Sequence, residues 1–251
     1  MVLCGDDVSR WGKAMVGAGL ALSISACSHM PWRHAKGDPL EPVNRVVFAF
    51  NKVADKAVLK PIAKTYQTIM PKPARKGVRN FLDNLQAPIV FVSDVLQGKP
   101  KRAVKTVARF AINTTVGIGG VLDVAKAAGI EKHAEDLGQT LAVRGMGPGP
   151  YLVLPIYGAT NARDLAGLGA ELATSPLSFT RFQGKQTFGR VRLALNTMDR
   201  RVETLQEMKI IRNKSKDEYA SVRSYYAQMR KNAIADAPIG SVEEGESLSL
   251  K

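Results

Sequence analysis

The chain has 251 residues, of which 45% are apolar and 23% are charged, so it can form a packed core and is not a disordered protein. Its 36 lysines and arginines outnumber its 22 aspartates and glutamates, and the resulting charge of +14 favours anionic partners. The two cysteines are Cys4 and Cys27, so the rest of the chain holds neither a disulfide scaffold nor a thiolate zinc site.

The first predicted element is an uncharged apolar segment, residues 14–26. It is shorter than the ~20 residues that a membrane-spanning helix needs and has the length of a signal-peptide core. It ends in the sequence ISAC, which resembles the lipobox of bacterial lipoproteins. We therefore predict a signal peptide over residues 1–26 and a lipidated Cys27. The alternative is an ordinary cysteine that follows a buried helix.

Ser28, the residue after the predicted lipidation site, favours sorting to the outer membrane. Residues 27–37 are polar and predict an irregular tether. Beyond them, apolar residues from Val43 to Ala57 recur every three or four positions, which predicts a helix with one apolar face. We predict that this helix, around residues 43–58, embeds at a membrane; packing inside the domain is the alternative.

Further helices are predicted along the rest of the chain. Pro88 separates two short ones, because proline breaks the hydrogen-bond ladder inside a helix. An amphipathic helix places Lys101, Lys105 and Arg109 at intervals of four, either as a solvated face or as contacts to anionic headgroups. The predicted ranges are 74–86, 88–97, 101–112 and 163–174, then a long helix around Val191–Leu205 and a last one around Tyr219–Ala233. The acidic tail over 236–251 is predicted to be disordered.

Two segments rich in glycine interrupt these helices. Residues 113–129 contain GIGG, which lacks the spacing of a nucleotide-binding loop and predicts a tight turn with close helix packing. Residues 145–162 carry no charge, but their glycines and prolines exclude a spanning helix. They form either a core loop or a lipid-facing lining. The sole strand candidate is YLVLPIY, which Pro155 weakens.

The sequence offers no catalytic set. It contains no HExxH, GxSxG or Walker A motif. His133, the one histidine outside the tether, is interpreted as a surface residue, and Glu135 and Asp136 are interpreted as capping and hydrogen-bonding groups. We therefore expect no enzyme activity, no metal site, no cofactor and no nucleic-acid partner.

Six blocks of sequence together resemble one known family, the MlaA (VacJ) lipoproteins. The similarity covers roughly residues 38–230, and it is looser in the C-terminal third. The blocks are DPLEPVNRVVFAFNKVAD (38–55), NFLDNLQAP (80–88), RFAINTTVGIGGVLDVA (109–125), EDLGQTLAVRGMGPGPYLVLP (135–155), Arg163-Asp164 and DEYASVRSYYAQMR (217–230).

The resemblance implies an all-α, ring-like single domain over residues 38–235, built from amphipathic helices with breaks rich in glycine and proline. It also implies a lipid-anchored protein on the periplasmic side of the outer membrane. Such a protein takes mislocalised phospholipids from the outer leaflet, works beside a trimeric porin, and passes the lipids to a soluble periplasmic carrier. A structural lipoprotein that scaffolds porin or envelope complexes is the alternative.

The resemblance also nominates individual residues. Phe48, Phe50 and Asn51 correspond to a family motif that we place at the lipid path or its gate, although Asn51 could instead simply form hydrogen bonds inside the domain. The residues expected to serve structural roles are Asp38, Pro39, Asn44, Arg45, Asn80, Asn84, Arg109, Asn113, Gly117, Gly119, Gly120, Asp123, Asp136, Gly138, Gly149, Pro150, Tyr151, Arg163 and Asp164.

Overall fold

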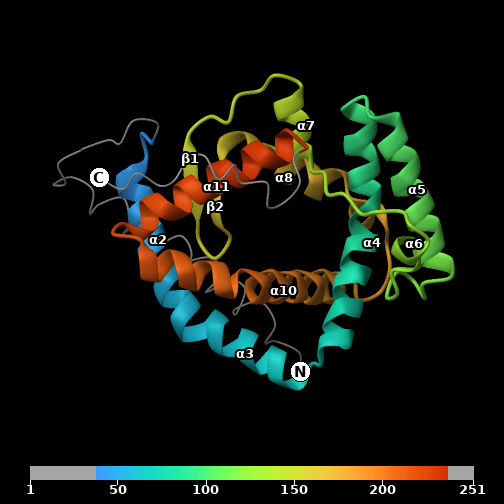
Figure 1. The fold of residues 1–251 in the computed structure, drawn as a ribbon, viewed down its shortest axis with the longest axis horizontal. Helices are drawn as coiled ribbons and strands as arrows, with labels where there is room; N and C mark the ends of the chain where they lie inside the picture. The colour runs from blue at the N-terminus through green and yellow to red at the C-terminus, as the bar shows by residue number, and fades with distance from the viewer. Residues whose placement is uncertain (1–37, 237–251) are drawn as a thin grey trace, which may run out of the picture.

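The structure, a computed structural model, describes residues 38–236. The predicted signal peptide, Cys27, the tether and the tail from residue 237 lie outside the described residues. Figure 1 shows helices arranged as a ring around a central opening. The described part is mostly helical and forms one domain, which confirms the predicted fold class.

In chain order the elements are α2 (Glu41–Ala54), the π-helical turn η2 (Asp55–Leu59), α3 (Lys60–Ile69), α4 (Lys72–Leu96), α5 (Pro100–Thr115), α6 (Val124–Ala127), α7 (Leu137–Val143), β1 (Tyr151–Leu154), β2 (Gly158–Asn161), α8 (Ala162–Thr174), α9 (Pro176–Phe179), α10 (Lys185–Lys214) and α11 (Glu218–Ile234).

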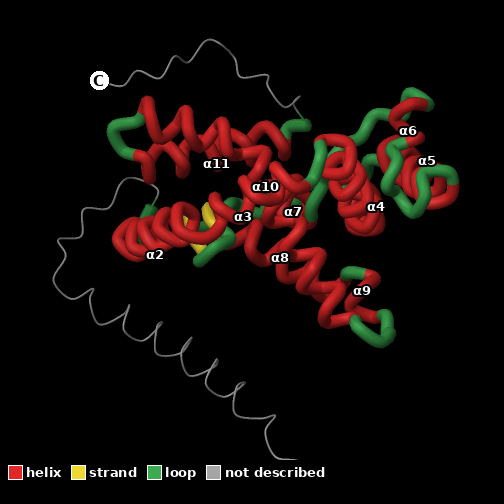
Figure 2. Tube along the Cα trace, turned by 90° about the horizontal axis from the view of Figure 1, so that it is seen from below, coloured by secondary structure: helices red, strands yellow, loops and turns green. Residues whose placement is uncertain are grey.

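The ring is built from contacts between helices that are far apart in the sequence. Helices α2, η2 and α3 follow one another along one side, and α10 packs against both α3 and α4. Helix α4 pairs with α5, while α7 packs on α8. Helix α11 contacts α7, α10 and β2. In the view turned by 90°, α11 lies on one side of the ring and the α8–α9 segment projects on the other (Figure 2).

Helix α4 corrects one sequence prediction. Residues 74–86 and 88–97 were expected to form two helices, but α4 is continuous, with Pro88 inside it. Proline costs ~3 kcal/mol in a helix interior because it removes one hydrogen bond and clashes with the preceding turn. Packing of α4 against α5, α7 and α10 on both sides of the proline holds the helix together.

The predicted strand candidate forms half of a small hairpin. Strands β1 and β2 pair antiparallel, from Tyr151 opposite Asn161 to Leu154 opposite Gly158. Pro155 lies in the connecting turn, where its missing N–H is not needed for pairing. The hairpin is the one sheet among residues 38–236.

The glycine turn after α5 brings backbone into close contact with α4, as its composition predicted. Gly120 has φ +97°, and a Cβ atom built there would lie 2.4 Å from Cβ of Asn84. Only glycine fits, because the position combines a left-handed backbone with no space for a side chain. Similarly, a Cβ atom on Gly167 of α8 would lie 2.3 Å from the backbone nitrogen of Gly138 of α7, so the two helices cross at these glycines.

The polarity of α2 is inverted relative to that of a helix in a water-soluble protein. Its apolar residues Val46, Phe50 and Val53 are exposed, and the exposed fraction of Val53 reaches 67%. Its asparagine Asn44 is buried with 2% exposed. Soluble domains place such apolar stripes against their core. The apolar face that the sequence identified therefore points out of the ring.

Candidate functional site

Two asparagines of α2 hold the free edge of β1. The Asn44 side chain donates from Nδ2 to the carbonyl of Tyr151 at 2.9 Å, and its Oδ1 accepts from the N–H of Val153 at 2.9 Å. Asn51, two helical turns later, bonds in the same way to the turn after β1, at 2.9 and 2.7 Å. The two carboxamides thus take the place of a neighbouring strand. At these points they satisfy the backbone N–H and C=O groups that the edge of β1 would otherwise leave unpaired.

Asp38 joins the start of the described chain to α11. Its carboxylate is fully buried, and it accepts hydrogen bonds from Asn44, from the Tyr219 hydroxyl and from Arg223. Burial and the nearby carboxylate raise the pKa of Tyr219. Arg45 of α2 adds a two-pronged ion pair to Asp217 at 2.6 and 3.2 Å and lies 4.5 Å above the Tyr219 ring.

A second buried cluster ties the other half of α11 to α7 and α8. The Arg230 guanidinium bonds to Asp136 at 2.6 and 3.1 Å and to Asp164 at 2.9 Å. Asp164 also accepts from Tyr226 and from Arg163. Burial acts to raise the pKa of Asp136, but the hydrogen bond and charge of Arg230 outweigh it, so the pKa of this carboxyl is lowered.

Asp136 and Gly138 fulfil the predicted local roles. The Asp136 carboxylate caps α7 by accepting the N–H of Gln139 at 2.7 Å. Gly138 lies against Asp164, because a Cβ atom there would come within 2.8 Å of its carboxylate. The cap confirms the prediction that Asp136 caps a helix and forms hydrogen bonds.

The third cluster links α5 to α6 and to its N-cap residue, Asp123. Arg109 bonds to Asp123 at 2.8 and 3.0 Å, and Asn113 bonds both to Asp123 at 3.0 Å and to the N–H of Ala125 at 2.9 Å. Burial acts to raise the pKa of Asp123, but the bonds from Arg109 and Asn113 outweigh it and lower the pKa. Arg109 is therefore an internal link and not part of a free basic stripe on α5.

The remaining nominated residues lie at turns and cluster edges. Asn80 and Asn84 of α4 donate to the carbonyls of Val121 and Gly119 at 3.1 and 3.3 Å. Gly149 has φ +66°, and the Pro150 carbonyl accepts the N–H of Ala162 at 3.2 Å, which closes the base of the hairpin. Gly117, Gly119 and Gly120 form the turn after α5, Tyr151 is in the buried cluster, and Pro39 is exposed just before α2.

His133 is not the surface residue that the sequence suggested. Its Nε2 lies 3.0 and 2.9 Å from the two carboxylate oxygens of Asp94, which is fully buried. Thr106 donates to the same carboxylate at 2.7 Å. The histidine thus connects the loop before α7 to helix α4.

Glu135 is the buried centre of a second group on this loop. Its side chain accepts from Gln97 at 2.8 Å, from Lys99 at 3.2 Å and from Arg102 at 3.0 Å. Among the described residues, no three histidine, aspartate or glutamate side chains gather in a way that could hold a metal ion.

The ring encloses a cavity of about 1020 Å³ with mixed walls. Apolar parts come from residues such as Ile89, Leu168 and Met229. The polar lining includes Asn80, Asp83, Gln86, Arg192, Asn196 and Arg200, from α4 and α10. Tyr157, which follows the turn at the hairpin tip, also lines it, and burial raises its pKa.

Burial shifts the pKa of two charged residues on the cavity wall, Arg192 and Glu171. Arg192 donates to Gln86 at 3.2 Å, and burial lowers the pKa of its guanidinium. In the described part of the chain no carboxylate forms an ion pair with it. Burial likewise raises the pKa of Glu171, although its Oε1 accepts the N–H of Leu137 at 2.9 Å. The cavity thus holds a partly desolvated cation that an anionic group would neutralise.

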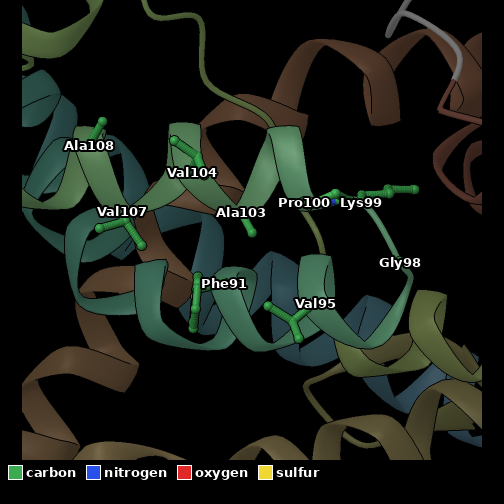
Figure 3. A pocket seen from close by; sticks show the side chains of 9 residues that line it. All are labelled: Phe91, Val95, Gly98, Lys99, Pro100, Ala103, Val104, Val107 and Ala108. Carbon is green, nitrogen blue, oxygen red and sulfur yellow. The ribbon is translucent and has the colours of Figure 1, made fainter.

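The outside of the ring is apolar over several helices. Besides the α2 stripe, a groove of about 560 Å³ lies between α4 and α5, lined by Phe91, Val95, Ala103, Val104 and Val107 (Figure 3). In residues 38–236 no helix combines the length and the apolarity that crossing a membrane requires. Such a surface fits the apolar part of a lipid layer better than water.

The structure separates the three residues placed at the lipid path. Phe48 packs edge-on against Tyr219 with ring centroids 5.6 Å apart and belongs to the core cluster. Phe50 points to the outside. Asn51 bonds to Leu154 and Ile156, next to the cavity lining. These bonds are compatible with Asn51 as part of a gate and with Asn51 as an internal hydrogen-bonding residue, because they hold a turn that lines the cavity.

Sequence reasoning missed the residues that close the ring. Tyr219, Arg223, Tyr226 and Arg230 of α11 reach both buried aspartate clusters. Their spacing of four, three and four places them on one helix face, and this signal was present in the sequence. Gly167, which allows α7 and α8 to cross, gave no such signal.

An apolar outer surface, a buried polar interior and a cavity with charged walls define a helical ring protein whose exterior is suited to contact with lipid. A family model described as MlaA lipoprotein matches residues 36–233. The chain belongs to this MlaA lipoprotein family.

Several relatives match over most of their length. A protein of Rickettsia bellii is 38% identical over 198 residues, which cover 78% of this chain and 76% of the relative. Proteins of Haemophilus influenzae and Escherichia coli, each named intermembrane phospholipid transport system lipoprotein MlaA, are 33% and 34% identical. The alignments cover 85% and 84% of this chain, and 84% and 83% of those relatives.

The fold also matches a solved structure with a TM-score of 0.70 and 34% identity, covering 78% of this chain and 98% of the other. That structure comes from work on the structural basis for maintenance of bacterial outer membrane lipid asymmetry.

Proposed function

We propose that this chain is the lipid-anchored outer-membrane component of a phospholipid transport system. It removes mislocalised phospholipids from the outer leaflet and passes them to a soluble periplasmic carrier, which maintains lipid asymmetry. The observation that carries the proposal is the mixed cavity inside an apolar ring. A phospholipid that crosses between leaflets must move a polar headgroup through hydrocarbon, and polar walls reduce that cost.

Arg192 gives the cavity a specific use. Its guanidinium is partly desolvated and bonds to the neutral side chain of Gln86. A lipid phosphate beside it would satisfy the charge through charge-assisted hydrogen bonds. The apolar wall residues would contact the first carbons of the acyl chains, so both halves of the lipid find matching surface.

The test is to narrow the cavity without changing the exterior. Gly189 lines the cavity, and a Cβ atom there meets nothing within 4 Å, so Gly189→Trp fits the helix and fills the path. Gly169 of α8 is equally open but does not line the cavity, so Gly169→Trp is the matched control. In cells that lack the native protein, outer-leaflet phospholipid should stay high with the first variant and fall with the second.

The same experiment separates transport from scaffolding. A scaffold for a porin or an envelope complex uses the outer surface, whereas Gly189→Trp changes the cavity wall and Gly169→Trp adds its side chain outside the cavity. If Gly189→Trp, at normal protein level, restores a normal outer leaflet, the lipid path through the cavity is wrong and the scaffold alternative is favoured. Labelled phospholipid incubated with the purified protein should be recovered without hydrolysis, because the proposal includes no catalysis.

The membrane anchor is a separate part of the proposal. Cys27→Ser should abolish labelling by a fatty-acid probe and leave the signal peptide uncleaved by the lipoprotein signal peptidase. A variant that is still labelled and matures to the same size would contradict lipidation at Cys27. A trimeric porin and a soluble lipid carrier complete the proposed system as its protein partners.

Phe48, Phe50 and Asn51 are proposed to set the gate of the lipid path. Asn51 fixes the turn whose Ile156 lines the cavity, so Asn51→Ala should alter lipid flow at an unchanged protein level if it acts as a gate. If Asn51 serves packing alone, the variant should be less abundant and behave as a simple loss. A stable, abundant variant with normal resistance of cells to detergent contradicts both readings.

A further inference from the structure

The corner that runs from Lys56 through α3 to the start of α4 carries only positive charge. Between Asp55 and Asp83 the sequence contains no carboxylate and seven cations, which are Lys56, Lys60, Lys64, Lys72, Arg75, Lys76 and Arg79. Arg79 is paired with Asp199 at 2.7 Å. Within residues 38–236, no carboxylate lies within ion-pair distance of Lys56, Lys60 or Lys64. A cluster of this kind repels itself unless an anion neutralises it.

Helix α3 separates its lysines from its exposed apolar residues. Ala63 is fully buried on the side that faces the ring, where α3 packs on α10. At ~100° per residue, Ile62 and Ile69 lie roughly 140–180° around the helix from Lys60 and Lys64. Ile69 is 76% exposed and Ile62 48% exposed, so nothing in the described part of the chain covers this flank.

These three faces match a helix that lies at a lipid–water boundary. One face holds the helix to the ring, the apolar flank points one way, and the lysine flank points the other. Figure 1 places α3 on the outer rim of the ring, where a lipid surface can reach it. Lysine stems can follow apolar surface while their ammonium groups reach the phosphate level.

We propose that the flank formed by Lys56 of η2 and by Lys60 and Lys64 of α3 docks on an anionic phospholipid leaflet, with Ile62 and Ile69 in its acyl region. Charge complementarity and the apolar flank together select this partner. An acidic protein surface would match the lysines but would leave the apolar flank on the opposite side exposed to water. Helix α5 is the weaker candidate, because Arg109 of its basic stripe is already paired with Asp123. The proposal extends the transport function and does not depend on it.

The experiment measures binding to two vesicle types by flotation. The mature chain with Cys27→Ser is used, so that the acyl anchor does not dominate. Vesicles consist of phosphatidylcholine alone or with one fifth phosphatidylglycerol. Each lysine near an anionic surface strengthens binding by roughly fivefold, so we expect at least ~10-fold tighter binding to the anionic vesicles at low salt. High salt should remove this preference.

Two lysine triples locate the effect. Replacing Lys56, Lys60 and Lys64 by glutamine should abolish most of the anionic preference while binding to phosphatidylcholine stays the same. Replacing Lys209, Lys214 and Lys216 removes the same charge from exposed positions at the end of α10 and should leave the preference intact. An unchanged preference in the α3 triple, or an equal loss in the control, overturns the proposal.

Two further variants test the remaining parts. Ile62→Asn with Ile69→Asn should weaken binding to both vesicle types, because the apolar flank enters either one, and unchanged binding would contradict insertion. Gly189→Trp narrows the cavity and should not change the anionic preference. If it does, the anionic lipid is bound as cargo inside the ring and the α3 surface is wrong, while a failure of α3 docking leaves the transport test unaffected.

Discussion

Carboxamide side chains form many of the internal links of this ring at the residue scale. An asparagine offers both a donor and an acceptor, so one side chain satisfies both an N–H and a C=O of a backbone segment. Asn44 does so for β1, and Asn113 does so between Asp123 and the backbone of α6. These residues lie inside, although a polar residue beside an apolar stripe would normally be assigned to the surface.

Replacing Asn44 by leucine should destabilise the protein strongly. The substitution keeps the size of the side chain but leaves a buried carbonyl and a buried N–H of β1 without partners, each costing ~1–3 kcal/mol. We expect a loss of about 2–5 kcal/mol in the free energy of unfolding, measured by denaturant titration in detergent. Val43→Ala, one residue away on the exposed stripe, should change it by less than ~0.5 kcal/mol. Equal stability of the two variants would contradict the asparagine link.

Two carboxylates should give stability opposite dependences on pH. The pKa of Asp136 is lowered despite burial, because Arg230 bonds to it, so its contribution is present above the unfolded pKa of ~3.9 and is lost as pH falls. The pKa of Glu171 is raised by burial, so stability declines as pH rises from ~4.3 through the folded pKa of Glu171.

Unfolding titrations between pH 3 and pH 7 check both signs. Glu171→Gln should remove the decline on the upper side, and Asp136→Asn should flatten the loss on the acid side. Both amides can still accept the backbone N–H that each carboxylate accepts now. If the stability of Glu171→Gln falls with pH above pH 4 as steeply as that of the wild-type protein, burial does not raise the pKa of this carboxyl.

Local roles were predictable from the sequence, and distant partners were not. The cap formed by Asp136 depends on residues three positions away, so the sequence predicted it correctly. The burial of His133 depends on Asp94 of another helix, and its interpretation as a surface residue was wrong. The partners of Asn51 lie 103 and 105 residues further along the chain, beyond the reach of any local pattern.

The glycine turn after α5 makes a prediction at the scale of elements. Gly119 and Gly120 both have positive φ, but a Cβ atom on Gly119 meets nothing within 4 Å, while one on Gly120 strikes Asn84. Gly119→Ala should cost ~1–2 kcal/mol from backbone strain alone. Gly120→Ala should cost clearly more, because α4 and the turn must also move apart. Thermal unfolding in detergent measures the difference, and equal losses would mean that the contact with α4 relaxes freely.

Periodicity predicted most helices but not their environment. Spacings of three and four correctly placed α2, α5, α8, α10 and α11. The same spacings say nothing about which face meets water, so the prediction that α2 embeds at the membrane depended on its position close to the predicted anchor; the structure exposes its apolar stripe. Pro88 led to a predicted break because local propensity was weighed without the packing that holds α4 straight.

At the scale of the whole molecule, the apolar exterior should bind membranes without the acyl anchor. The mature Cys27→Ser chain should float with phosphatidylcholine vesicles. Phe50→Asn with Val53→Asn, on the exposed stripe of α2, should reduce binding roughly tenfold or more, because burying each apolar side chain is worth ~1.5–3 kcal/mol. Gln228→Asn, at an exposed polar position of α11, is the control. A double variant that binds as well as the control would place the stripe outside the membrane.

Ring closure was the feature least accessible to sequence patterns. The family resemblance implied a ring, yet no helical period in the chain could show that α11 bridges the beginning and the middle of the domain. The bridge consists of single polar contacts between residues 62 to 185 positions apart. In the sequence these contacts are visible only as the spacing of four, three and four on α11, and the sequence around their partners shows no corresponding pattern.

The position of α11 imposes an order on biogenesis. It is the last described helix to be synthesised, and it supplies partners for Asp38, Asp136 and Asp164. Until it is synthesised, Asp38 lacks Tyr219 and Arg223, Asp136 lacks Arg230, and Asp164 has Arg163 but lacks Tyr226 and Arg230, so the ring stays open. The ring can therefore close only after the C-terminal helix of the described chain has been synthesised, so a truncated polypeptide that lacks α11 cannot reach the final shape.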